Sequence, residues 1–160
     1  MNGLAGEPMA KRSIRDIEKV WSRVEGVRKL SDRVVGIGPW GVGMDGLLTW
    51  IPLVGGAYSV GAGALLFASA LQAKASPKTL AKMSAYLLFD VAVTEVPVLG
   101  SAVDFVFVAH QFAGRALQKD IESTHWVEAN EREAKASGDH ERHLADMRTA
   151  GRKRVVYLHD

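Results

Sequence analysis

Hydrophobic residues recur every three or four positions over residues 11–34, and this period predicts an amphipathic helix. Its apolar stripe consists of Ile14, Ile17, Val20, Trp21, Val24, Val27, Leu30 and Val34. Basic residues lie away from the stripe, and Glu25 with Lys29 is a favourable i,i+4 pair. Two interpretations stay open: a surface helix that covers a core, or a helix that lies on an anionic membrane surface.

The longest uncharged run, residues 46–73, has enough length for a bilayer span, which takes about 20 apolar residues. Three residues interrupt it: Pro52, Gly55 and Gly56. Because proline removes a helical hydrogen bond and clashes with the preceding turn, we predict two helices that meet there, the second over residues 57–75. Small residues at four-residue spacing permit close helix approach and predict homo-oligomer contacts; they are Gly55, Ser59 and Gly63.

Two further apolar helices follow. Ser76 is suited to cap a helix whose first position is Pro77, and this helix is expected to end at residue 96 before Pro97 and Gly100. The next begins near residue 102 and continues past residue 117. Residues 123–160 are polar and are expected to be mobile or helical, with a break at Ser137-Gly138 and with a solvated surface.

An internal repeat relates the central helices. The segment Asp45-Gly-Leu-Leu-Thr-Trp-Ile-Pro52-Leu-Val-Gly55-Gly-Ala matches Asp90-Val-Ala-Val-Thr-Glu-Val-Pro97-Val-Leu-Gly100-Ser-Ala in the same register. Two copies are too few for a solenoid, so we predict a pseudo-symmetric pair. The expected fold is all-α: two Pro/Gly-broken apolar helical hairpins, with an amphipathic helix before them and a polar helical tail after. The expected divisions are a flexible N-terminus (1–10), a duplicated helical core (11–122) and a charged, partly disordered or helical tail (123–160).

The repeated Asp-x6-Pro-x-x-Gly pattern, with Gly43-Met44-Asp45 before the first copy, resembles domain-of-unknown-function family 4112. The similarity spans about residues 24–122. It implies a bacterial or fungal, membrane-associated protein and brings no established activity. Where the family pattern has an aspartate after each Pro-x-x-Gly, this chain has Gly56 and Ser101. Any cation site made by those acids has therefore lost two ligands here, although Asp45, Asp90 and Asp104 remain.

Charged residues are distributed unevenly along the chain, and composition excludes several classes of function. Segment 35–112 has few charged residues, whereas both ends of the chain are rich in them. The charged residues of this segment are Lys74, Lys78, Lys82, Asp45, Asp90, Glu95 and Asp104. The net charge of +2 is too small to indicate nucleic acid, and the absence of cysteine excludes thiolate metal sites and disulfides. The first residues lack the apolar run of a secretory signal, which predicts a cytoplasmic start.

Three carboxylates in the charge-poor centre are the candidate functional residues: Asp45, Asp90 and Asp104. They either brace the repeat by accepting backbone hydrogen bonds or form a cation or proton site between the two halves. His140 and His143 are interpreted as part of a solvated helix face, and His110 as a core or interface histidine. No nucleophile, phosphate-loop or zinc-protease motif occurs, so we expect no enzyme, no cofactor and no metal.

The chain is therefore expected to be a non-catalytic helical protein of the cell membrane that serves as an accessory module or as an ion- or proton-handling module. Its hairpins would dip into lipid with their tips at residues 52–56 and 97–100, and its basic segments and termini would lie on the cytoplasmic side. The rival is a soluble helical bundle that binds a protein partner. Acids such as Asp90 and Asp104 favour the rival, because a charge at a membrane centre costs roughly 2.5–3.5 kcal/mol.

Overall fold

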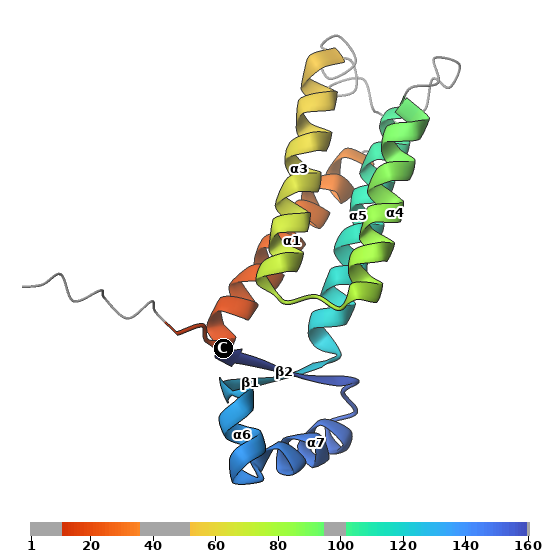
Figure 1. Ribbon diagram of the computed structural model, residues 1–160. Helices are drawn as coiled ribbons and strands as arrows, with labels where there is room; N and C mark the ends of the chain where they lie inside the picture. The colour runs from red at the N-terminus through yellow and green to blue at the C-terminus, as the bar shows by residue number, and fades with distance from the viewer. Residues whose placement is uncertain (1–10, 36–51, 95–101, 160) are drawn as a thin grey trace, which may run out of the picture. The chain divides into compact units, whose positions relative to one another are not determined.

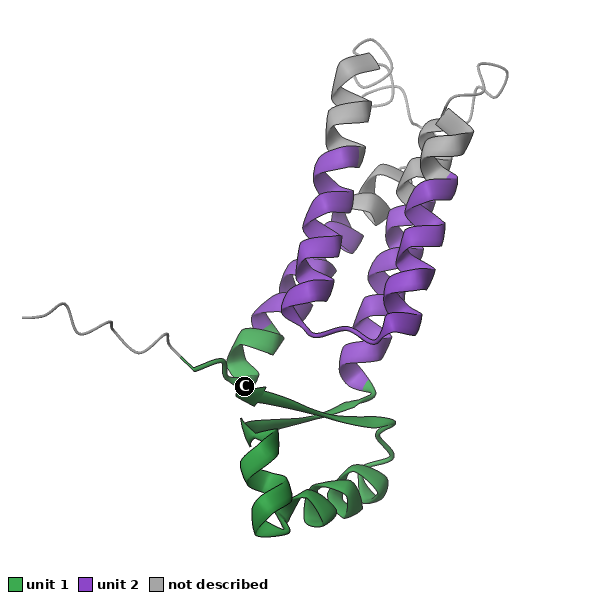
Figure 2. Cartoon of the chain, viewed as in Figure 1, with its two compact units in different colours: residues 1–18, 123–160 green, residues 19–122 purple. Residues whose placement is uncertain are grey.

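The computed structural model describes the backbone of residues 11–35, 52–94 and 102–159, and the side chains of residues 11–30, 60–89 and 108–159. Its elements follow one another in Figure 1 as helices, then a strand, two short helices and a final strand. The chain divides into two compact units, coloured separately in Figure 2. We call residues 19–122 the helical unit, and residues 1–18 with 123–160 the sheet unit.

The helical unit is built from four helices: α1 (Ile14–Val35), α3 (Pro52–Gln72), α4 (Pro77–Thr94) and α5 (Ala102–Glu122). The first residues of α1 belong to the sheet unit. Helices α4 and α5 pack along each other, and α3 contacts both. Their buried side chains, together with those of α1, form one core. Fully buried members are Val24, Leu66, Ala70, Met83, Ala113 and Leu117.

The connection between α3 and α4 is fixed at Ser76, which caps α4 as its sequence predicts. Ser76 Oγ accepts a hydrogen bond from the Thr79 backbone N–H at 3.3 Å. The Asp120 carboxylate of α5 in turn accepts from both the backbone N–H and the hydroxyl of Ser76, each at 2.9 Å. The connector and the C-terminal part of α5 therefore lie at the same end of the helical unit.

The start of α3 differs from the prediction. The helix begins at Pro52 rather than at residue 57, so Gly55 and Gly56 lie inside it and do not break it. Proline is tolerated at the first helical position, because the N–H that it lacks has no partner there in any case. The segment that contains Asp45 and the segment that contains Pro97 and Gly100 lie outside the described residues. The pseudo-symmetry of the two hairpins therefore stays a prediction.

The sheet unit corrects the all-α expectation. Strand β1 (Thr124–Asn130) and strand β2 (Arg154–His159) pair in parallel, with α6 (Glu131–Ser137) and α7 (Asp139–Thr149) between them. Parallel strands need a long crossover, which the two helices supply. The part of the chain expected to be a mobile or helical tail is thus a β-α-α-β motif with its own small core of Val127, Ala134 and Tyr157.

Local contacts explain where the two short helices begin and end. The Asn130 side chain accepts hydrogen bonds from the backbone N–H groups of Arg132 and Glu133, at 2.8 and 3.3 Å, and so caps α6. Gly138 has a φ of +82°, a left-handed conformation that glycine adopts without strain, and it separates α6 from α7. The break predicted at Ser137-Gly138 is confirmed.

Candidate functional site

The candidate site of the helical unit is the exposed surface of α3, α4 and α5. Between Val60 and Leu71, every exposed residue of α3 is uncharged. By the helical rise, that stretch is about 16 Å long. Val60 is 73% exposed and Leu71 is 59% exposed, and exposed apolar side chains are informative where several occur together.

The exposed residues of α4 change character along the helix. Its first two turns expose Lys78 and Lys82, whereas its later turns expose Tyr86, Leu88 and Phe89. Leu88 is 68% exposed and Phe89 is 59% exposed. The helix therefore has a basic end at the connector and an apolar end beyond it.

Helix α5 follows the same division. Phe112 is 47% exposed and its ring stacks on that of Tyr86, with 5.6 Å between the ring centroids. Nearer the connector, α5 exposes Arg115 and Lys119. We call the exposed large residues of these three helices the apolar surface. It consists of Val60, Leu65, Leu71, Tyr86, Leu88, Phe89 and Phe112.

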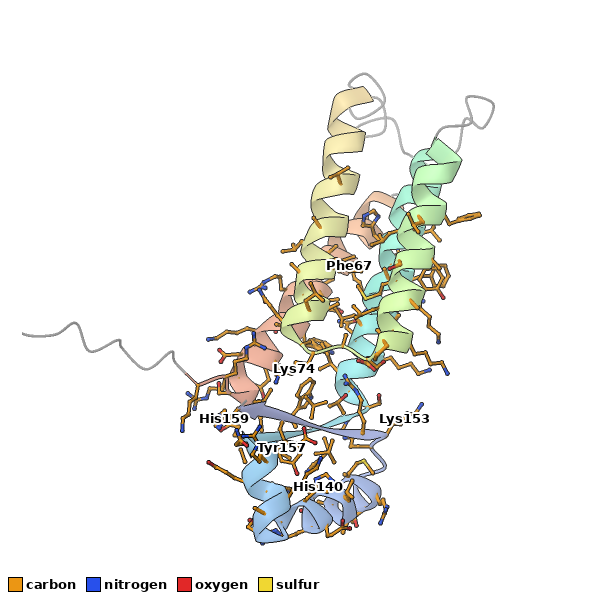
Figure 3. All side chains as sticks on the ribbon, in the orientation of Figure 1. Phe67, Lys74, His140, Lys153, Tyr157 and His159 are labelled. Carbon is orange, nitrogen blue, oxygen red and sulfur yellow. The ribbon has the colours of Figure 1, made fainter. Side chains whose placement is uncertain are left out.

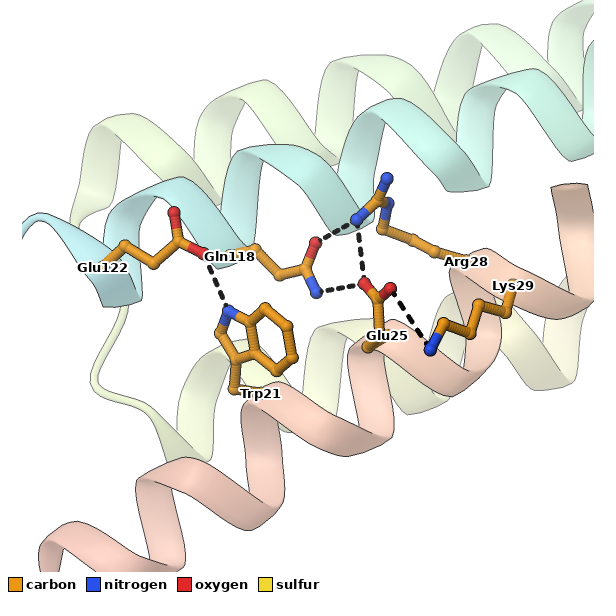
Figure 4. Close-up of polar contacts among 6 residues, drawn as sticks. All are labelled: Trp21, Glu25, Arg28, Lys29, Gln118 and Glu122. Atoms are coloured by element: carbon orange, nitrogen blue, oxygen red, sulfur yellow. Dashed lines mark hydrogen bonds and ion pairs between the residues drawn. The ribbon is translucent and has the colours of Figure 1, made fainter.

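A polar cluster of the helical unit holds α1 against α5 (Figure 4). Gln118, only 4% exposed, donates from Nε2 to Glu25 Oε2 at 2.8 Å and accepts from the Arg28 guanidinium. Arg28 also pairs with Glu25 at 2.9 Å, and the Glu25–Lys29 pair expected from the sequence is present at 3.8 Å. These contacts link carboxylate, amide and guanidinium groups, so the cluster has a structural role.

The ionisation of Glu25 reflects this cluster. The hydrogen bond from Gln118 is the main cause that lowers the pKa of Glu25 below its usual value of 4.5. Partial burial opposes it, and the charges of Arg28 and Lys29 lower the pKa further. The carboxylate form is therefore favoured in the folded chain. One further contact joins the two helices: the Trp21 indole N–H donates to Glu122 at 3.0 Å.

The residues singled out from the sequence are only partly described. Asp90 lies in α4 and Asp104 in α5, but neither side chain is among those described, and Asp45 is outside the described residues. Of the three small residues expected to mediate oligomerisation, only Gly63 is fully described. A Cβ atom on Gly63 would lie 3.6 Å from His110 Nε2 and 3.7 Å from Leu87 Cδ2, so Gly63 packs inside its own unit. His110 is fully buried, as expected of a core histidine.

The histidines of α7 do not lie on a fully solvated face, as the sequence had led us to expect. His140 and His143 are both half-buried and lie beside Tyr157 of β2. Figure 3 shows His140 and Tyr157 in the sheet unit, and His140 Nδ1 lies 3.0 Å from the Tyr157 hydroxyl. The missed signal was in the strands: 124–130 and 154–159 are rich in β-branched, aromatic and other apolar residues, a composition typical of strands.

Comparison with known proteins identifies the family. The sequence model of DUF4112, a domain of unknown function, matches residues 20–121, so the chain belongs to that family. No curated protein and no solved structure matches the chain. Among the described residues, no helix is long and apolar enough to cross a bilayer, and the expectation of transmembrane helices finds no support there.

Proposed function

We propose that this DUF4112 protein is a non-catalytic, membrane-associated helical protein whose helical unit inserts shallowly into the lipid interface through its apolar surface. The observation that carries the proposal is the change from exposed lysines to exposed leucine and phenylalanine within α4. Exposure of large apolar side chains to water is unfavourable in free energy. Insertion of these side chains into the lipid interface removes that unfavourable contribution.

The basic end of the unit fits the same arrangement. Lys78, Lys82 and Lys119 are exposed near the connector and would meet anionic headgroups while the part of the apolar surface beyond the connector contacts acyl chains. Each basic residue near an anionic surface contributes about 1 kcal/mol. By the positive-inside rule, we place this end and the chain termini on the cytoplasmic side of the cell membrane.

The second candidate is a protein-binding helical bundle. Asp90 and Asp104 lie in α4 and α5, and acidic residues resist insertion into lipid, which favours a protein partner or a second copy. In that case the apolar surface would be covered by protein, and oligomerisation through Gly55 and Ser59 stays a prediction alongside it.

Vesicle flotation of the full chain separates these candidates. We expect the chain to float with vesicles that contain phosphatidylglycerol and to float less with neutral phosphatidylcholine vesicles. Leu88→Ser with Phe89→Ser should weaken vesicle binding about thirtyfold, since burial of the exposed parts of two such side chains is worth about 2 kcal/mol. Leu30→Ser is the matched control, because Leu30 is 49% exposed on α1, whose other exposed residues are mostly charged or small.

The outcomes are distinct. Binding that falls in the α4 double variant and persists in Leu30→Ser supports the proposal. A monodisperse chain that remains in the aqueous fraction with both vesicle types overturns it. If that chain is a dimer by light scattering, and the α4 double variant is a monomer, the protein-binding candidate is supported instead.

A further inference from the structure

Three side chains of the sheet unit bring metal-ligand atoms together. His125 comes from β1, and His143 and Asp146 come from α7. One ligand atom from each lies within 4.8 Å of the other two. The His125 and His143 rings are also close, with 6.3 Å between their centroids. The parallel crossover makes this possible, because it returns α7 to the strand that began the motif.

The helix presents its two ligands on one face. His143 and Asp146 are three residues apart, a spacing that places side chains on adjacent turns of a helix. Both histidines are half-buried and Asp146 is exposed, so the cluster is open to ions from solvent. Within the described part of the chain, no hydrogen bond or ion pair engages these three side chains. The donors are therefore available.

Neighbouring residues hold the helix in place. The His143 ring meets Tyr157 edge-on, with 5.9 Å between centroids, and His140 contacts the Tyr157 hydroxyl at 3.0 Å. Tyr157 is itself buried at 6% exposure. Two histidine contacts to one buried ring fix α7 against the sheet, which orients the His143 imidazole before any ion arrives.

The donor chemistry selects the ion. Two imidazole nitrogens and one carboxylate oxygen suit a borderline transition metal such as Zn²⁺, whereas Mg²⁺ and Ca²⁺ prefer oxygen ligands. With bonds of about 2.0–2.1 Å, neighbouring ligands of a tetrahedral Zn²⁺ lie about 3.3 Å apart. The three ligand atoms lie within 4.8 Å of one another, and rotation of the exposed Asp146 side chain can bring its carboxylate to that spacing.

We propose that His125, His143 and Asp146 bind one Zn²⁺-like ion, with water in the fourth position. The ion would join α7 to β1 across the crossover and stabilise the sheet unit. This proposal is independent of the membrane association of the helical unit. A vesicle-binding result therefore leaves it unaffected.

Titration of the full chain, purified without an affinity tag and treated with a chelator, tests the site. We expect one equivalent of Zn²⁺ to bind with micromolar or tighter affinity, measured by competition with a chromogenic zinc indicator, and Mg²⁺ not to compete. His125→Ala and His143→Ala should each weaken binding about a hundredfold or more, because loss of a direct ligand exceeds the roughly 10–100-fold cost of losing an outer partner. Asp146→Asn removes the charge but keeps an oxygen that can still approach the ion, so it should have the smaller effect and weaken binding about tenfold.

A matched control uses a histidine outside the cluster. His159 lies on β2 and contacts the Arg12 carbonyl at 3.0 Å, so His159→Ala should bind Zn²⁺ as the unaltered chain does. Asp146→Asn replaces an exposed side chain with one of the same shape and should leave the fold unchanged. A change in Zn²⁺ affinity in this variant therefore reports the loss of the ligand charge. Absence of stoichiometric binding overturns the proposal, as does binding that survives both cluster histidine substitutions.

Discussion

Gly114 of α5 lies against the side chains of Arg28 and Val24 of α1, and its replacement tests that packing. A Cβ atom at this position would lie 2.8 Å from Cγ and 3.1 Å from Cδ of Arg28, and 3.4 Å from Val24 Cγ1. Favourable carbon–carbon contacts are about 3.5–4.0 Å. Because Cγ is close to the Arg28 backbone, the side chain has little freedom to move away.

Two opposing effects determine how much Gly114→Ala changes the free energy of unfolding. Alanine favours a helix over glycine by about 1 kcal/mol. Overpacking costs about 1–3 kcal/mol, and displacement of Arg28 would also weaken its hydrogen bonds to Glu25 and Gln118, worth about 1 kcal/mol or more where partly exposed. We expect a net destabilisation of about 1–3 kcal/mol.

The matched controls are two glycines at which an added methyl group would meet no other part of the chain. A Cβ atom on Gly26 of α1 or Gly61 of α3 would meet nothing within 4 Å. Gly26→Ala and Gly61→Ala should therefore stabilise the chain by about 0.5–1 kcal/mol. Thermal unfolding followed by circular dichroism should place Gly114→Ala below both controls by about 4 °C or more. A Gly114→Ala chain as stable as the Gly26→Ala chain would show that α1 does not pack on α5 as described.

Two further measurements address polar side chains of the helical unit. Ser69 is 1% exposed and its hydroxyl has no hydrogen-bond partner among the described residues. Ser69→Ala should therefore raise the free energy of unfolding by about 0.5–1 kcal/mol. A loss of stability in guanidinium denaturation would show that the hydroxyl does have a hydrogen-bond partner. The lowered pKa of Glu25 means that its stabilising effect is present above the usual value of 4.5 and is lost as pH falls through the lower folded-state pKa. The stability difference between the unaltered chain and Glu25→Gln should accordingly shrink between pH 7 and pH 3, and a constant difference would refute the role of the charge.

Helical periodicity predicted most of the helical unit because each helix has local signals. The apolar stripe located α1, and Ser76 with Pro77 located the start of α4. The start of α3 was predicted wrongly because proline is compatible with two different structures at this point. Proline breaks a helix in its interior and begins one at its first position, and the choice depends on residues before it.

The sheet unit was missed for a different reason. Its two strands are separated by the residues of α6 and α7, so their pairing is a non-local contact that no short sequence window contains. The charged residues of the two helices dominated the composition and hid the apolar positions Val127 and Tyr157. The proposed metal cluster was missed with it, because His125 and His143 come together only after the strands pair in parallel.

The depth of the proposed membrane insertion follows from the charges that accompany the apolar surface. The seven residues of the apolar surface are between 37% and 73% exposed, and burying the exposed part of each is worth about 1 kcal/mol, or about 7 kcal/mol together. Asp90 directly follows Phe89 in α4, and carrying Asp90 and Asp104 to the bilayer centre would cost roughly 5–7 kcal/mol. Deep insertion therefore gains almost nothing. An interfacial position about 5–10 Å deep keeps the gain from leucine and phenylalanine and leaves the acids within reach of water, which is why the proposal is a shallow association.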